Sequence, residues 1–176
     1  PELAYQENNT AAFVSDELSR LDISHRIGVG ETGIIAELGE KTTGVDSLLP
    51  CVALRSDMDA IPLDEETNLS FSSANPGVMH ACGHDGHMAM LLGAAELLQQ
   101  VDLPGRGVLL FQPAEESGNG AEKPIEACAL DGVKMIFAGH IDTNYPVGTF
   151  TVDSGLLCSY TYPFTITITV RGGHAA

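Results

Sequence analysis

Residues 48–54, with the sequence LLPCVAL, form the stretch on which the fold prediction depends. An apolar run of this length is typical of a strand that is buried on both faces of a parallel sheet. Residues 107–111, GVLLF, form a second run of this kind. Residues 33–38 and 135–138 are predicted as two further strands.

Helical segments lie before and between these strands. Residues 86–100 are predicted as a strongly apolar helix and residues 121–130 as a second helical segment. Residues 9–22 have the spacing of an amphipathic helix that Asn9 or Thr10 can cap, with apolar positions at Phe13, Val14, Leu18 and Leu21. Because apolar strands alternate with helices, we expect an α/β fold with a mostly parallel sheet flanked by helices.

A different pattern begins toward the end of the chain. Residues 149–152 and 160–170 are predicted as strands, and the second of these alternates apolar and polar side chains. Strict alternation is typical of an antiparallel strand with one buried face. We therefore expect residues 1–161 to belong to a first domain and residues 162–176 to begin a second, antiparallel α+β domain.

The composition narrows the possible partners. The chain of 176 residues carries 24 acidic and 8 basic side chains, for a net charge of −16. This balance argues against nucleic acid and anionic membranes, since both are bound by clustered Lys and Arg. The acidic excess either keeps the protein soluble or supplies carboxylates that hold cations. No apolar run approaches the roughly 18 to 20 residues of a membrane span, and the first residues do not resemble a signal peptide.

The cysteines do not form the pattern of a disulfide framework. Cys51, Cys82, Cys128 and Cys158 lie far apart in dissimilar contexts. Cys51 and Cys128 fit apolar core positions, whereas Cys82 stands among histidines. We therefore expect a reducing, cytoplasmic setting.

Polar residues follow the predicted strands, where open α/β sheets collect their ligands. Asp57 and Asp59 come first, although a solvated turn with a helix-capping Asp explains them equally well. Residues 79–87 then hold three histidines, Cys82 and Asp85. Imidazole and thiolate are preferred ligands of zinc and related metals. A Cys–His nucleophile pair is the rival interpretation of this segment.

Two further polar groups follow two further strands. Glu115 and Glu116 come after residues 107–111, and His140 comes after residues 135–138. Adjacent glutamates point in different directions, so one can bind a metal while the other acts as a general base. Each feature alone is weak, but four consecutive candidates at strand ends form a pattern that surface charge does not explain.

These motifs resemble those of the M20 metallopeptidases, and within them the aminoacylase-like amidohydrolases. This subfamily includes hippurate hydrolases, N-acetyl-diaminopimelate deacetylases and plant indoleacetyl-amino-acid hydrolases. The resemblance is carried by residues 55–62, 80–87, 112–116, 139–140 and 172–176, in the family's order. It implies a zinc-exopeptidase-like catalytic domain followed by the start of a lid and dimerisation domain.

The resemblance also implies a role for each polar residue. The expected metal ligands are Cys82, His84, Glu116 and His140. Glu115 is the expected general base, and His174 resembles a lid-domain histidine that stabilises the oxyanion, often across a dimer. Three aspartates are expected to orient the ligands: Asp57, Asp59 and Asp85. Cys82 stands where other M20 enzymes carry a bridging aspartate, and Asp57 where most carry a ligand histidine.

The implied activity is hydrolysis of the amide bond of an N-acyl amino acid by a water activated by two divalent ions. Zinc, manganese, nickel and cobalt all suit this mixed ligand set. The resemblance further implies a small-molecule substrate and a homodimer formed through the lid domain. The family supplies one more ligand histidine late in a longer chain, so we expect this sequence to be a fragment.

Three alternatives stay open at this point. The chain can be a non-catalytic metal-binding fragment or pseudo-enzyme, although the Glu115–Glu116 pair argues against a pure metal binder. It can be a metallo-dipeptidase or carboxypeptidase of the same family. It can also be a hydrolase with Cys82 as nucleophile.

Overall fold

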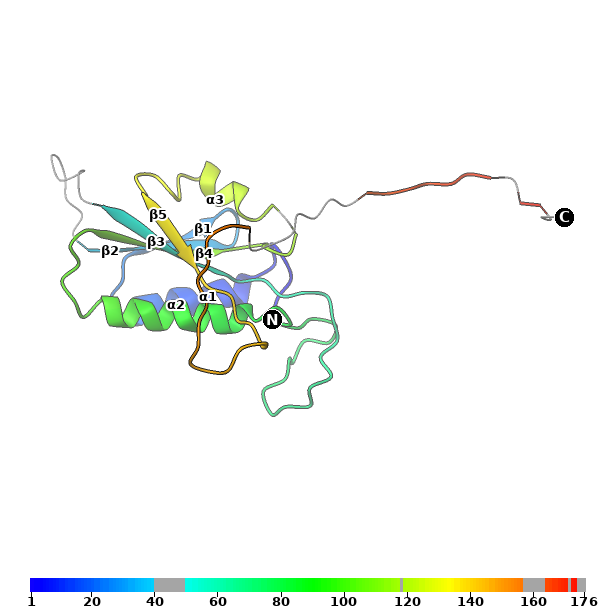
Figure 1. Cartoon of the computed structure of the whole chain (residues 1–176), viewed down its shortest axis with the longest axis horizontal. Helices are drawn as coiled ribbons and strands as arrows, with labels where there is room; N and C mark the ends of the chain where they lie inside the picture. Colours follow the sequence, from blue (N-terminus) through cyan, green and yellow to red (C-terminus); the bar gives the residue numbers. More distant parts are fainter. Residues whose placement is uncertain (40–49, 118, 157–163, 171, 174–176) are drawn as a thin grey trace. The chain divides into compact units, whose positions relative to one another are not determined.

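The apolar runs of the sequence pair into one sheet. The computed structural model describes residues 1–39, 50–117, 119–156, 164–170 and 172–173. Within these residues, five strands lie in the order β1-β2-β4-β3-β5 (Figure 1). The strands are β1 (His25–Val29), β2 (Gly33–Leu38), β3 (Cys51–Asp57), β4 (Arg106–Gln112) and β5 (Met135–Ala138).

The sheet is mixed rather than wholly parallel. β3 pairs in parallel with both β4 and β5, whereas β2 is antiparallel to β4 and to β1. The α/β class is therefore confirmed, and the parallel part consists of three neighbouring strands. The sequence did not reveal β1, because three of its five residues are exposed and Gly28 interrupts its apolar pattern.

Two helices cover one face of the sheet and a third covers the other (Figure 1). They are α1 (Asn8–Arg20), α2 (His84–Leu98) and α3 (Glu122–Glu126). α2 begins earlier than expected, which puts His84 in its first turn. α3 is shorter than expected, and Cys128, just beyond it, has a positive φ of 62° that a helix cannot accommodate. Among the described residues, no helix has both the length and the apolar character needed to span a bilayer.

Side chains on the two faces of the sheet belong to separate cores. The core beneath α1 and α2 includes Val14, Leu18, Ile34, Ala36, Met88, Leu91, Ala95, Leu109 and Phe111. The core on the opposite face includes Val29, Ile35, Cys51, Ala53, Val108, Leu110 and Ala129. Successive residues of β2 and β4 alternate between these cores, as the period of two in a strand requires.

The start of α1 is stabilised differently from the prediction. Asn9 and Thr10 lie inside the helix, so neither caps it. Their backbone N–H groups instead donate to the Glu2 carboxylate at 3.1 and 2.8 Å. Burial alone would raise the pKa of Glu2, but these hydrogen bonds from Thr10 and Asn9 lower it. A carboxylate that precedes the helix thus satisfies donors that a helix start leaves unpaired.

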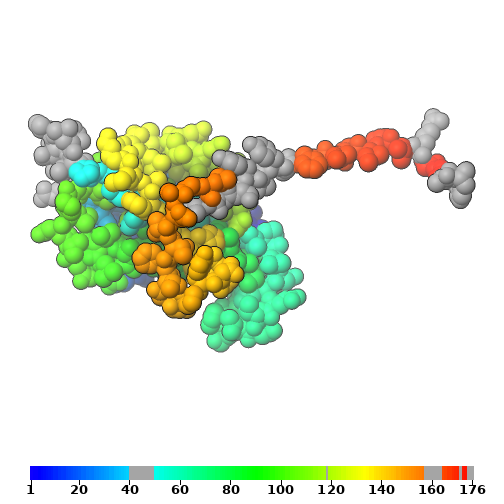
Figure 2. Space-filling model, in the orientation of Figure 1, coloured from blue at the N-terminus to red at the C-terminus, as the bar shows by residue number. Residues whose placement is uncertain are grey.

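A long loop joins β3 to α2. An antiparallel bridge between Ile61 and Met79, with both N–H···O distances at 3.1 Å, closes this loop at its base. Residues 61–78 project beyond the bridge and form the teal bulge in Figure 2. The bridge therefore brings the residues just after β3 close to those just before α2.

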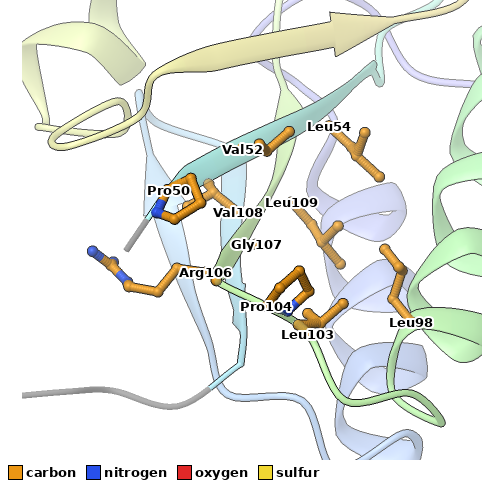
Figure 3. Close-up of a pocket in the computed structure, with 11 residues that line it drawn as sticks. Pro50, Val52, Leu54, Leu98, Leu103, Pro104, Arg106, Gly107, Val108 and Leu109 are labelled. Carbon is orange, nitrogen blue, oxygen red and sulfur yellow. The ribbon is translucent and has the colours of Figure 1, made fainter. Parts of the chain in front are cut away.

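An apolar pocket of roughly 260 Å³ lies at the other end of the parallel strands (Figure 3). Its walls include Pro50, Val52, Leu54, Leu98 and Leu103. It is formed by the beginnings of β3 and β4, whereas the polar motifs of the sequence follow the ends of these strands. The pocket is therefore separate from the candidate site.

Residues 142–176 form a second unit. The expected strand at 149–152 is not formed, and the described part of the expected strand at 160–170 contains no strand either. Its apolar positions are exposed: Phe164, Ile166, Ile168 and Val170. The prediction failed because an alternating strand is stable only against partner strands, and the described residues provide none. Residues 160–163 lie outside the described residues, and the domain boundary after residue 161 stays a prediction.

The two apolar cores predict that substitutions of a buried and of an exposed leucine differ clearly in their effect on stability. Leu109 is fully buried in β4, whereas Leu97 of α2 is 69% exposed. We expect Leu109→Ala to lower the free energy of unfolding by about 2–5 kcal/mol, because it leaves a cavity beneath α1 and α2. Leu97→Ala should stay within about 0.5 kcal/mol of the parent. Denaturant unfolding followed by circular dichroism measures both, and equal losses would contradict this account of the core.

Candidate metal centre

The polar groups that follow the strands converge on one point. Nε2 of His84 lies 3.6 Å from Oδ2 of Asp57, at the end of β3. The same nitrogen lies 3.9 Å from Glu115 Oε2 and 3.8 Å from Glu116 Oε1, on the turn after β4. Three parallel strands end at the same edge of the sheet, and the first turn of α2 lies over this edge. The site is therefore a product of the parallel pairing.

Donor atoms of three expected ligands lie within reach of one cation. Cys82, His84 and Glu116 each offer an atom, and these atoms lie within 4.8 Å of one another. His140, which follows β5, has Nε2 at 3.4 Å from Cys82 Sγ. All four expected ligands are thus brought together. Thiolate, imidazole and carboxylate donors in one cluster fit a borderline divalent metal ion.

The hydrogen bonds of the two candidate ligand histidines place a ring proton on Nδ1. His84 Nδ1 lies 2.8 Å from the backbone oxygen of Asp59, and His140 Nδ1 lies 2.7 Å from that of Ile141. A carbonyl oxygen can only accept, so each Nδ1 carries the proton and donates it. In the neutral form of each ring, Nε2 then carries a lone pair and faces the other candidate ligands. Metal-binding histidines are commonly oriented in this way.

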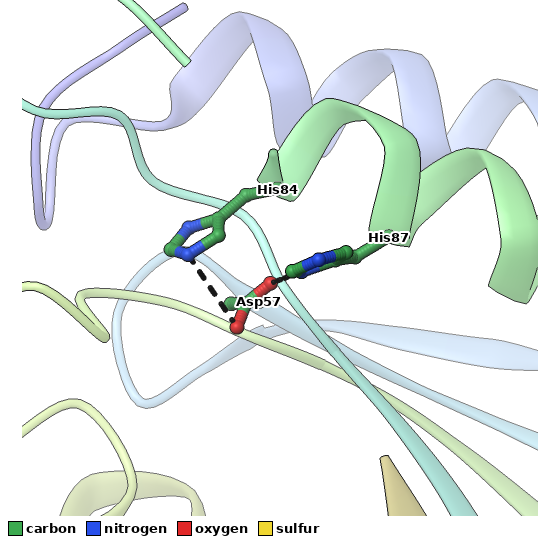
Figure 4. Close-up of side chains that lie close together, drawn as sticks. All are labelled: Asp57, His84 and His87. Atoms are coloured by element: carbon green, nitrogen blue, oxygen red, sulfur yellow. Dashed lines mark hydrogen bonds and ion pairs between the residues drawn. The ribbon is translucent and has the colours of Figure 1, made fainter. Parts of the chain in front are cut away.

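Asp57 is fully engaged by its neighbours (Figure 4). Its Oδ1 accepts from His87 Nδ1 at 2.7 Å, and its Oδ2 accepts from Arg55 Nη1 at 2.7 Å. Burial raises the pKa of this carboxyl, but the His87 hydrogen bond and the Arg55 charge together lower it. Asp57 is therefore an ionised carboxylate whose partners are charged or hydrogen-bonding side chains. This geometry suits a group that orients its surroundings.

His87 is a residue that the sequence analysis did not single out. It is 3% exposed, and its Nε2 accepts the backbone N–H of Ile141 at 3.0 Å. Its Nδ1 must then carry the proton that Asp57 accepts. The donor atoms of Asp57, His84 and His87 lie close enough together to surround one cation. However, both nitrogens of His87 already take part in hydrogen bonds, so His87 has no lone pair left for a metal. The sequence could have indicated His87 by its position three residues after His84, because residues with this spacing lie on the same face of a helix.

Asp59 holds the turn that carries the two glutamates. It is fully buried, and its Oδ1 and Oδ2 each accept a backbone N–H, from Glu115 and Glu116, at 3.0 Å. Burial raises its pKa, but the His84 and backbone hydrogen bonds lower it below its usual range. Asp85 instead is exposed, and its Oδ1 accepts from Gly86 N rather than from a candidate ligand. His174 lies outside the described residues.

The cluster concentrates negative charge. Burial and then the neighbouring Glu116 raise the pKa of the Cys82 thiol to about 11. Burial and the charge of Glu116 also raise the pKa of Glu115. Nucleophilic cysteines need a lowered thiol pKa, so these surroundings do not activate Cys82 as a nucleophile. A cation among these groups would reverse the effect, because it favours thiolate and carboxylate.

The fold and the cluster define an α/β protein with a candidate metal site at the ends of its parallel strands. The model of peptidase family M20/M25/M40 matches residues 53–175, and the chain belongs to this family.

Curated and solved relatives agree with this assignment. IAA-amino acid hydrolase ILR1-like 5 of Arabidopsis thaliana is 45% identical to this chain. The match covers 100% of this chain and 40% of that hydrolase. N-acetyl-L-cysteine deacetylase of Bacillus subtilis is 42% identical to this chain, and the match covers 100% of this chain and 42% of the deacetylase. The crystal structure of a dinuclear metal binding peptidase of the M20 family from Bacillus subtilis matches with a TM-score of 0.78 and 42% identity, over 84% of this chain and 41% of that one. This chain spans less than half the length of each.

The thiol pKa predicts how metal binding depends on pH. With a pKa of about 11, Cys82 carries its proton at neutral pH, and a cation that binds the sulfur must displace that proton. The apparent affinity for zinc or cobalt should therefore rise with pH, by about tenfold per unit between about pH 6 and 8. Titration of the chain with cobalt(II) at three pH values measures the slope. An affinity that is independent of pH would show that the thiol is not a ligand.

Proposed function

We propose that this chain is the metal-binding part of a two-metal amidohydrolase that cleaves the amide bond of an N-acyl amino acid. The observation that carries the proposal is the cluster of Cys82, His84 and Glu116 donor atoms beside the Glu115 carboxylate. The names of the relatives support the substrate class, since an IAA-amino acid and N-acetyl-L-cysteine both contain an acylated amino acid nitrogen.

The proposed ligands are the four residues that the cluster gathers: Cys82, His84, Glu116 and His140. Two divalent ions held there would polarise the substrate carbonyl and make a water molecule more acidic. Asp57 and Asp59 would orient the groups that surround the ligands through hydrogen bonds. Asp57 holds His87, and Asp59 holds the backbone of the glutamate turn.

Glu115 is the proposed general base. Its side chain is part-buried beside His84 Nε2, at 3.9 Å, and burial together with Glu116 raises its pKa. A carboxylate of raised pKa is a stronger base, which suits a group that accepts a proton from water. Glu115 would accept a proton from water as the oxygen attacks the acyl carbon. It would then deliver that proton to the amine nitrogen as the carbon–nitrogen bond breaks.

Other assignments stay predictions of the resemblance. They include the oxyanion role of His174, the lid domain from residue 162, the homodimer and the cytoplasmic location. A carboxypeptidase activity is the second candidate. It differs from the first only in the acyl group, which is itself part of a peptide, and a substrate panel separates the two.

Metal content tests the proposed ligands. We expect close to two zinc, manganese, nickel or cobalt ions per chain and a clear loss in Cys82→Ala, because the thiolate is one of the four donors. Inductively coupled plasma mass spectrometry of both proteins, purified in parallel, provides the measurement. Cys128→Ala is the matched control, since Cys128 is exposed and outside the cluster. Equal metal content in all three proteins would exclude Cys82 as a ligand.

Turnover measurements test the proposed role of Glu115 as the general base. Glu115→Gln keeps the size and polarity of the side chain but cannot accept the proton. We expect it to retain the metal and to lose turnover of N-acyl amino acids by about 10²–10⁴-fold. Glu122→Gln, in the first turn of α3, serves as the control that also removes one acidic charge. Full-length protein is the sample, and near-parental turnover in Glu115→Gln would refute the assignment.

A further inference from the structure

Glu7 is a buried acidic side chain that lies outside the metal cluster. It immediately precedes α1 and is fully buried. Its Oε2 accepts the Thr32 hydroxyl at 2.6 Å, and its Oε1 accepts the backbone N–H of Ala114 at 2.8 Å. Neither partner is a cation. Burial of a carboxylate is costly unless hydrogen bonds compensate it, so this arrangement calls for a reason.

The partner Ala114 begins the turn that carries the two glutamates. Ala114 has a φ of 52°, in the left-handed region, which a residue with a side chain rarely adopts. Such a conformation persists only where the surroundings impose it. In addition, the Ser117 hydroxyl donates to the Ala114 backbone oxygen at 2.9 Å. The backbone N–H and the backbone oxygen of Ala114 are therefore both held by hydrogen bonds.

Three successive N–H groups of the turn donate to two buried carboxylates. Ala114 N–H donates to Glu7, and the N–H groups of Glu115 and Glu116 donate to the two oxygens of Asp59. Consecutive N–H groups that face one side form a concavity that binds anions. Here the anions belong to the protein itself, and they come from the start of α1 and the end of β3.

We propose that Glu7 is a positioning residue that, together with Asp59, fixes the left-handed turn at Ala114 and thereby directs Glu115 and Glu116 into the metal cluster. Glu7 reaches the turn only through the backbone N–H of Ala114, because its other hydrogen bond comes from the Thr32 side chain, outside the turn. The positioning concerns the turn itself, and its consequence for metal binding rests on the proposed function.

The two hydrogen bonds of Glu7 allow matched variants. Glu7→Ala removes both bonds, and Thr32→Val removes only the bond that does not reach the turn. Glu7→Gln keeps the length and an acceptor for Ala114, so it should restore the turn. Glu7→Asp retains the charge but is one methylene too short to reach both partners, and it replaces Glu7→Ala if that variant does not fold by circular dichroism.

Cobalt(II) titration of the chain is the first measurement. We expect Glu7→Ala to bind cobalt at least about tenfold more weakly than the parent, with altered visible bands, because Glu116 is no longer held in place. Thr32→Val and Glu7→Gln should keep the parental spectrum and an affinity within about threefold of the parent. Equal weakening by Glu7→Ala and Thr32→Val would overturn the proposal, as would parental binding in folded Glu7→Ala.

Amide hydrogen exchange followed by NMR separates this proposal from the proposed function. Without any metal, exchange at Glu115 and Glu116 should be faster in Glu7→Ala than in Thr32→Val, because only the first variant releases the turn. A parent chain that binds no cobalt would overturn the proposed function, while faster exchange would still support the positioning role. Unchanged exchange at both amides would overturn the positioning role whether or not the chain binds metal.

Discussion

The parallel pairing of β3 with β4 and β5 is the constraint on which the site depends. In this register Asp57 lies opposite Gln112, and Arg55 lies opposite Ala138. The three strands therefore end together, and the polar groups that follow each strand share one edge of the sheet. A shift of one residue would turn the side chains of a strand to the other face and disperse the cluster. The two apolar cores oppose such a shift, since they bury alternate residues of β2 and β4.

This convergence has an electrostatic cost. A thiol and three carboxylates meet where β3 and β4 end, and burial together with these neighbouring charges raises the pKa of Cys82 and of Glu115. The fold manages the cost by hydrogen bonding. The Arg55 charge offsets that of Asp57, His87 donates a hydrogen bond to Asp57, and backbone N–H groups donate to Asp59. The remaining charge faces the Nε2 lone pairs of the two histidines, which is the environment that a divalent cation requires.

Local pattern was sufficient for the four apolar strands β2 to β5 and for the four expected ligands, but not for β1, for His87 or for the hydrogen bonds that hold the site. The bounds of β2 and β5 follow from short apolar runs, and four polar clusters at strand ends do meet. The hydrogen bonds from Ala114 to Glu7 and from Ile141 to His87 link distant parts of the chain, and no local pattern encodes them. Residues 164–170 show that a local pattern can also predict a strand that does not form. Alternating apolar and polar residues form a stable strand only where a partner strand exists.

The high pKa of Cys82 also bears on oxidative damage. Peroxides attack thiolates, and the rate follows the fraction of sulfur that is ionised. Without a cation, burial and the carboxylates around Cys82 favour the protonated sulfur at neutral pH, which is the form that peroxides attack slowly. The same surroundings that would favour a cation at the sulfur would therefore also slow its oxidation for as long as no cation is bound.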